Sequence, residues 1–204
     1  MSTKVRFRQE TKARGQMVLE TPPHMRTIFP GHGKPVSVPF PYLIHIINYG
    51  IDGKNYTYYG VYDKGLCVFL ATEPLASLDT LLCYSPTDME RSGLVCTNHA
   101  YDRRSYLSAR ELANDVLGVW SGMIHNIRHD DLEKWKKLTV ANTCKYSWQN
   151  AFTLRAALEW DAVHAQGFGN YGGKAKEGLL TVPAKCALIN EELNDVPAIG
   201  DLDE

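Results

Sequence analysis

The sequence predicts a single α+β domain in which a four-stranded antiparallel meander precedes a set of helices. Three observations support this fold class. Short segments rich in β-branched and aromatic residues lie between Val36 and Tyr84, turn-forming residues separate them, and helical periodicity begins only at Ser108. The chain of 204 residues has the length of one ordinary domain.

The predicted strands occupy four consecutive segments joined by short turns. Gly50–Gly53 and Asp63–Gly65 supply the turn chemistry between them. Short connections favour antiparallel neighbours, because a parallel pair needs a crossover of roughly a dozen residues or more. The strands are expected at residues 41–49, 55–62, 66–70 and 79–84.

The helical part is expected to begin at Ser108, because Glu111 follows at the spacing of a capping box. Apolar residues then recur at steps of three and four, which gives the helix one apolar face. A second helix is expected near Leu132–Leu138 and a third near Trp148–His164. The expected apolar face consists of Leu112, Val116, Val119, Trp120, Met123 and Ile127.

Charge and composition divide the chain and limit its partners. Residues 1–20 form a basic N-terminal segment, residues 21–166 the α+β domain, and residues 167–204 a glycine-rich hinge with an acidic tail. The formal net charge is −1, so nucleic acid is an unfavoured partner. Neither a secretory signal nor a membrane-spanning segment is evident, which predicts a cytoplasmic protein.

Cys96 is the first candidate for chemistry. It lies between a turn and the first helix, and Arg91, Asn98, His99 and Arg104 are near it in the sequence. A thiol reacts as the thiolate, so partial exposure and nearby positive charge favour a nucleophilic role. A buried structural cysteine remains the alternative, since the five cysteines are scattered and include no Cys-x-x-Cys pair.

Two further patterns admit a functional and a structural interpretation. Cys96 and His99, together with His125 and His129, have spacings that suit a zinc site, although histidines at a helix end also interact with its terminal carbonyls.

Five tyrosines between positions 49 and 62 could stack on single-stranded nucleic acid. Cross-strand packing explains them better, because alternation places Tyr56 and Tyr58 on one face of a strand.

The order of these pieces resembles that of a ubiquitin-conjugating enzyme. In that family a proline follows the last strand of a meander, and a Gly-x-Ile-Cys segment contains the acceptor cysteine. Here Pro86 precedes Cys96 by ten residues in a similar arrangement. Bacterial and phage relatives, the PRTRC system protein B group, are more similar still. The similar segments are Pro23–Phe29, Val38–Ile44, Leu66–Leu70, Asp79–Pro86, Gly93–Cys96 and Trp120–Asn126.

The resemblance implies that Cys96 accepts a ubiquitin-like modifier as a thioester from a ThiF-like activating enzyme and passes it to an amine. Asn98 and His99 would support the transfer, and no metal or small cofactor would be needed. Thr87 and Asp88 depart from the pattern, because the family has an asparagine after its proline. This hypothesis requires an exposed Cys96 and strands paired in chain order. Its alternatives are a non-catalytic interaction or virion-associated protein on the same scaffold, and a zinc-binding domain.

Overall fold

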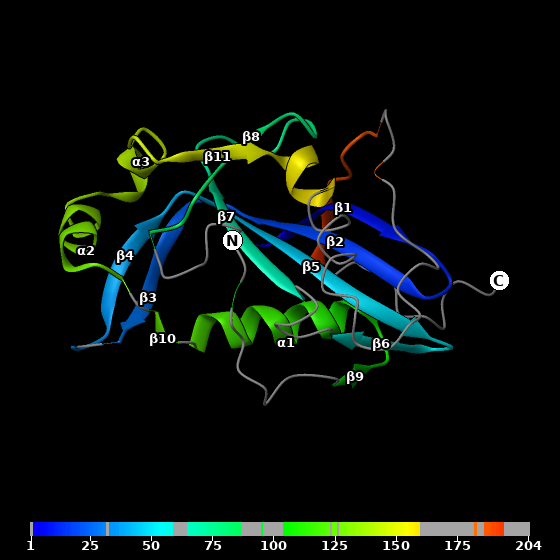
Figure 1. The fold of residues 1–204 in the computed structure, drawn as a ribbon. Coiled ribbons are helices and arrows are strands. Elements are labelled where there is room, and N and C mark those ends of the chain that lie inside the picture. The colour runs from blue at the N-terminus through cyan, green and yellow to red at the C-terminus, as the bar shows by residue number, and fades with distance from the viewer. Residues whose placement is uncertain are drawn as a thin grey trace.

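The structure is a computed structural model, and it is mostly β. It describes residues 2–31, 33–58, 65–86, 95, 104–122, 124–125, 127–159, 182 and 186–193. Two sheets and three named helices lie within these ranges (Figure 1). Within this part of the chain, the helices are too short or too polar to cross a membrane.

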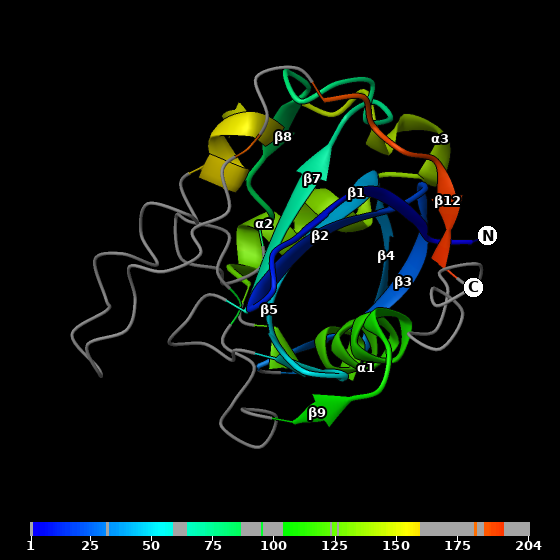
Figure 2. The same cartoon turned by 90° about the vertical axis from the view of Figure 1, so that its right-hand side faces the viewer.

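The main sheet has nine strands and curls into an open half-barrel (Figure 2). Its path runs β11-β8-β7-β5-β2-β1-β12, while β6 pairs with both β5 and β9. All of its pairings are antiparallel. The strands are β1 (Lys4–Glu10), β2 (Arg14–Thr21), β5 (Tyr42–Asp52), β6 (Asn55–Tyr58), β7 (Leu66–Ala71), β8 (Leu81–Cys83), β9 (Ser105–Tyr106), β11 (Asn150–Thr153) and β12 (Glu191–Glu192).

The expected meander is wrong, and with it the ubiquitin-conjugating-like α+β fold class. Strands do form in all four predicted segments, but β7 pairs with β5 and not with β6. The long strand β5 uses one edge for both partners: Tyr49–Asp52 faces β6, and Tyr42–Ile47 faces β7. Since β6 and β7 run in the same direction along that edge, they act as one interrupted strand. A meander would require β7 to run opposite to β6, and it does not.

The basic N-terminal residues belong to the main sheet. Strands β1 and β2 form a hairpin, and β2 pairs with β5 from Thr21 to Arg14. A register shift between Val5 and Phe7 places these two side chains in different hydrophobic clusters, as expected when a bulge interrupts the alternation of a strand. Both faces of this part of the sheet are therefore covered.

A smaller three-stranded sheet has the order β10-β3-β4. Strands β3 (His24–Pro30) and β4 (Val36–Phe40) are antiparallel, and β10 (Ile124–His125) runs parallel to β3. The free edge of β4 is covered by α2 and α3, because the carbonyl oxygen of Pro39 accepts hydrogen bonds from Trp135 Nε1 and Thr143 Oγ1. This covered edge supports the site described below.

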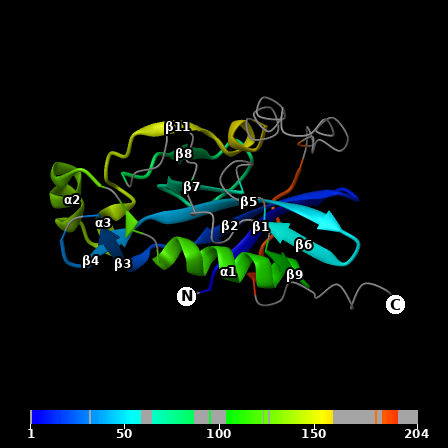
Figure 3. The same ribbon diagram turned by 60° about the horizontal axis from the view of Figure 1, so that its bottom comes forward.

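Helix α1 (Ala109–Gly122) begins where the sequence predicts. Ser108 Oγ accepts a hydrogen bond from the backbone N–H of Glu111 at 3.1 Å, and the Glu111 carboxylate accepts one from the N–H of Leu107. The helix lies along one face of the main sheet and packs through the buried Leu112, Ala113, Val116 and Trp120 (Figure 3).

The remaining helical predictions had mixed outcomes. Helix α2 (His129–Lys136) confirms the second predicted helix, and a short α3 (Val140–Thr143) follows it. The third predicted helix is wrong over its first part, because residues 150–153 form β11 and only residues 154–159 are helical among the described ones. Strand β11 pairs with β8, so tertiary pairing decides its conformation.

Candidate functional site

The residues of the predicted thioester site lie outside the described part of the chain. This applies to Cys96, Asn98 and His99, and also to Thr87 and Asp88. Only the neighbouring Val95 is described: it is buried, and its backbone N–H donates to the carbonyl oxygen of Leu66 at 3.0 Å. Three of the described thiols are poor substitutes: Cys67 and Cys83 are buried in strands, and burial raises the pKa of Cys83 and Cys144.

The zinc alternative gains no support from the described residues. The first helix ends at Gly122, so His125 lies in β10 and His129 is the first residue of α2, and the two do not share a helix face. Within the described ranges, no group of three or more His, Cys, Asp or Glu side chains is close enough to hold a metal ion.

The tyrosine cluster packs inside the protein, as cross-strand packing predicts. Tyr49, Tyr56 and Tyr58 are at most 5% exposed, and the rings of Tyr49 and Tyr56 lie 5.6 Å apart. The Tyr49 hydroxyl donates to the Glu10 carboxylate at 2.7 Å, and burial raises the pKa of Tyr49 well above its ordinary value. These three rings are therefore unavailable for stacking on nucleic-acid bases.

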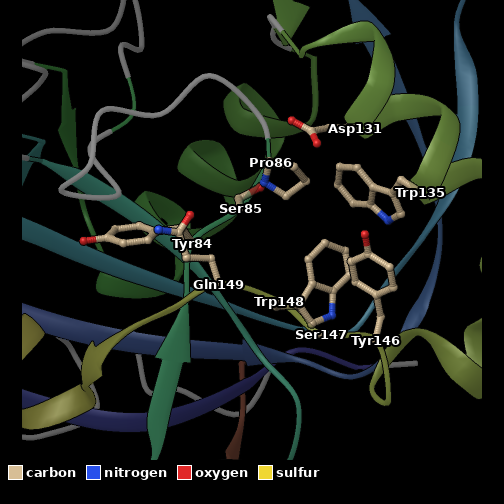
Figure 4. A pocket seen from close by; sticks show the side chains of 9 residues that line it. All are labelled: Tyr84, Ser85, Pro86, Asp131, Trp135, Tyr146, Ser147, Trp148 and Gln149. Atoms are coloured by element: carbon tan, nitrogen blue, oxygen red, sulfur yellow. The ribbon is translucent and has the colours of Figure 1, made fainter.

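A cavity lies at the end of β8, beside α2 and the segment that enters β11. It has a volume of about 220 Å³. Figure 4 shows the side chains around it, with indole and phenol rings on one side and Pro86 opposite Trp135. Its lining consists of Tyr84, Ser85, Pro86, Asp131, Trp135, Tyr146, Ser147, Trp148 and Gln149.

Trp135 forms a fixed wall of this pocket. Helix α2 presents it toward β4, where its indole N–H donates to the carbonyl oxygen of Pro39. The ring of Phe40 meets it edge-on, with centroids 4.6 Å apart. Only 1% of Trp135 is exposed, so its orientation is set by packing on both sides.

Trp148 and Tyr146 complete the aromatic wall. Their rings are 4.8 Å apart and inclined at 66°, and the ring of Trp148 lies 5.7 Å from that of Trp135. The Trp148 indole N–H donates to the carbonyl oxygen of Thr143 at 2.9 Å. Both pocket indoles thus use their N–H groups on backbone carbonyls. Since Trp135 is almost fully buried, the partly exposed Trp148 and Tyr146 present the aromatic carbon surface that a ligand can reach.

Local chain geometry explains why these aromatics meet. Thr139 and Asn142 form a reciprocal capping box at the start of α3, which fixes the turn between α2 and residue 144. The Tyr84 N–H donates to the carbonyl oxygen of Gln149 at 3.0 Å, and this bond joins the pocket segment to the end of β8. The pocket is therefore assembled from three chain segments that pack on the main and the smaller sheet.

Among the lining residues that the structure describes, Asp131 is the one with a formal charge at neutral pH. Its side chain is 41% exposed, and Lys134 Nζ lies 3.9 Å from its carboxylate. Such an exposed pair along a helix contributes little to stability, and a competing cation can displace it. Within the described part of the chain, no His, Cys, Lys or Arg lines the cavity.

The sequence interpretation missed this pocket. One signal was available: Tyr146 and Trp148 lie two residues apart in an otherwise polar segment, a spacing that places both rings on one side of an extended chain. Their convergence with Trp135 and Pro86 depends on tertiary structure and could not be inferred from spacing.

No family model, curated protein or solved structure matches the chain. The resemblance to ubiquitin-conjugating enzymes therefore stays a prediction based on short motifs.

Proposed function

We propose that the protein is a non-catalytic recognition protein that binds its ligand in the aromatic pocket formed by Trp135, Tyr146 and Trp148. The observation that supports this most strongly is a cavity of about 220 Å³ next to three rings, two of which are held by indole N–H bonds to the backbone. Pockets that combine aromatic walls with few polar groups are the usual form of a ligand site.

The chemistry of the lining favours binding over catalysis. A nucleophile needs a base or a cation beside it, and the lining residues that the structure describes include neither a histidine nor a lysine. The proposal therefore develops the interaction-protein alternative of the sequence analysis, without the conjugating-enzyme scaffold. A cytoplasmic location is part of the proposal, supported by the reduced thiols of Cys144 and Cys186, two of the described cysteines.

Fluorine NMR of the full chain labelled with 5-fluorotryptophan tests the proposal. The protein has four tryptophans, of which Trp135 and Trp148 line the pocket while Trp120 is fully buried against the sheet. In a screen of small aromatic and amine fragments, we expect saturable shifts of the Trp135 and Trp148 resonances and an unchanged Trp120 resonance.

A pair of variants at Trp148 supplies the control. Trp148→Leu and Trp148→Phe both lose the N–H bond to Thr143, but only the phenylalanine keeps an aromatic wall. We expect fragment binding to weaken more for leucine than for phenylalanine. If no fragment shifts the pocket resonances, or if the two variants bind equally, the proposed site is wrong.

The thioester-carrier hypothesis has lost one of its two requirements. It needed strands paired in chain order, and β7 instead pairs with β5. The exposure of Cys96 stays untested. A reducible adduct on Cys96 in the presence of a ThiF-like enzyme, a ubiquitin-like protein and ATP would establish carriage independently of fold; an unmodified thiol under these conditions would refute it.

A further inference from the structure

We propose that the aromatic pocket recognises an organic cation, an alkylated ammonium group on a small molecule or side chain. This inference rests on the proposed binding function and names its ligand class. The geometry points to a cation because aromatic surface, negative charge and a suitable volume occur together at one site.

Aromatic faces attract cations through the negative potential above the ring, and indole is the strongest of the natural side chains in this respect. The aromatic wall of the pocket consists of two indoles and the phenol of Tyr146, with neighbouring rings steeply inclined to one another. Inclined rings offer faces in different directions, which suits a rounded alkylated ammonium better than a flat ligand. The indole N–H groups of Trp135 and Trp148 do not oppose the cation, since they point to backbone carbonyls.

Asp131 supplies the charge. As the sole formally charged residue among the described lining residues, it favours a cation and opposes a carboxylate or phosphate, for which the described lining offers no cationic side chain. Its neighbour Lys134 lies on the same helix at 3.9 Å and is more exposed, at 62%. A ligand ammonium in the pocket would compete with this lysine for the carboxylate.

The cavity has room for such a group. A buried cavity of about 150 Å³ accommodates benzene, which is comparable in size to a trimethylammonium group. The pocket, at about 220 Å³, exceeds that volume. Its rim includes the exposed Ser147 and Gln149, so a substituent on the nitrogen can extend into solvent.

The test compares choline with its uncharged isostere 3,3-dimethylbutan-1-ol, using the fluorotryptophan-labelled full chain. The two molecules share shape and hydroxyl group, so their difference reports the charge. We expect choline to shift the Trp135 and Trp148 resonances with a Kd roughly two- to thirtyfold lower than that of the alcohol, the range given by cation–π contacts.

Charge variants on α2 identify the partner of the cation. Asp131→Asn should weaken choline binding by up to about fivefold, and Lys134→Gln should strengthen it, because the carboxylate loses its competitor. Asp130→Asn is the matched control: it removes the same charge from the same helix turn, but Asp130 does not line the pocket, and its effect should be small. The Trp120 resonance reports whether each variant is folded.

The outcomes separate the two proposals. Equal affinity for choline and the alcohol would overturn the cation inference and leave a binding pocket for apolar groups. Failure of choline to bind, while other fragments shift the pocket resonances, would overturn it in the same way. Equal effects of Asp130→Asn and Asp131→Asn would show that charge acts from a distance and not in the pocket, which also refutes the inference.

Discussion

The substitution His45→Leu should remove one contribution to the loss of stability at acidic pH, the protonation of this histidine in the unfolded chain. His45 lies in β5 and is fully buried, with the ring of Trp120 edge-on at 5.2 Å. Among the described residues, neither of its ring nitrogens has a hydrogen-bond partner. Burial lowers the pKa of His45 well below its ordinary value, and the positive charge of Arg26 adds to this effect.

The sign and size of the effect follow from linkage. The folded protein keeps His45 neutral, whereas the unfolded chain takes up a proton as the pH falls through the ordinary value of about 6.5, so acid favours unfolding. Between about pH 7.5 and about pH 5.5 the unfolded state gains about 1.4 kcal/mol from this one proton. Leucine binds no proton, so the variant lacks this contribution.

Urea unfolding of both proteins at the two pH values measures the difference. The wild type should lose about 1.4 kcal/mol more than His45→Leu over this interval. Other groups cancel in the comparison, including His24, whose pKa is also lowered by burial. If both proteins lose the same free energy of unfolding, His45 is either protonated in the fold or hydrogen-bonded, and the reasoning is refuted.

Three substitutions test packing and charge, with the free energy of unfolding as the measurement. Gly15→Ala should destabilise the protein by about 1–3 kcal/mol, because a Cβ at Gly15 would lie 2.1 Å from the ring of Tyr49. An unchanged free energy of unfolding would show that the Tyr49 ring does not lie against Gly15. Gly118→Ala, in an open part of α1, should instead stabilise it by up to about 1 kcal/mol, and destabilisation would contradict the helix position. Glu20→Gln should cost about 2 kcal/mol, since the nearly buried carboxylate lies 3.9 Å from Arg6; a neutral effect would show that the pair contributes nothing.

The sequence was informative about where strands form but not about how they pair. The run of β-branched and aromatic residues in β5 predicts a strand, and the structure confirms this prediction. Its eleven residues are long enough for two successive partners along one edge, which no local pattern reveals. The turn residues before Leu66 were interpreted as a reversal of the chain, although β7 continues in the direction of β6.

The N-terminal strands were missed for a different reason. In Lys4–Arg8, positive residues alternate with Val5 and Phe7, which is the period of a strand with one polar side. The charge led to the prediction of a basic N-terminal segment outside the α+β domain. In the fold, Arg6 instead contacts the Asn190 side chain and the Leu75 carbonyl oxygen, so charged side chains at a sheet edge connect distant segments.

The pocket depends on these unpredicted features, and that dependence bears on how it would bind. The Pro39 carbonyl at the edge of β4 accepts bonds from both Trp135 and Thr143, and Thr143 in turn accepts the indole N–H of Trp148. A chain of hydrogen bonds therefore runs from the smaller sheet to the aromatic wall. Rings held in this way lose little freedom when a ligand arrives, which lowers the entropic cost of binding. Only Asp131, half-exposed and paired with a mobile lysine side chain, has to change partner, so we expect selectivity for charge to be set there and affinity to be set by the rings.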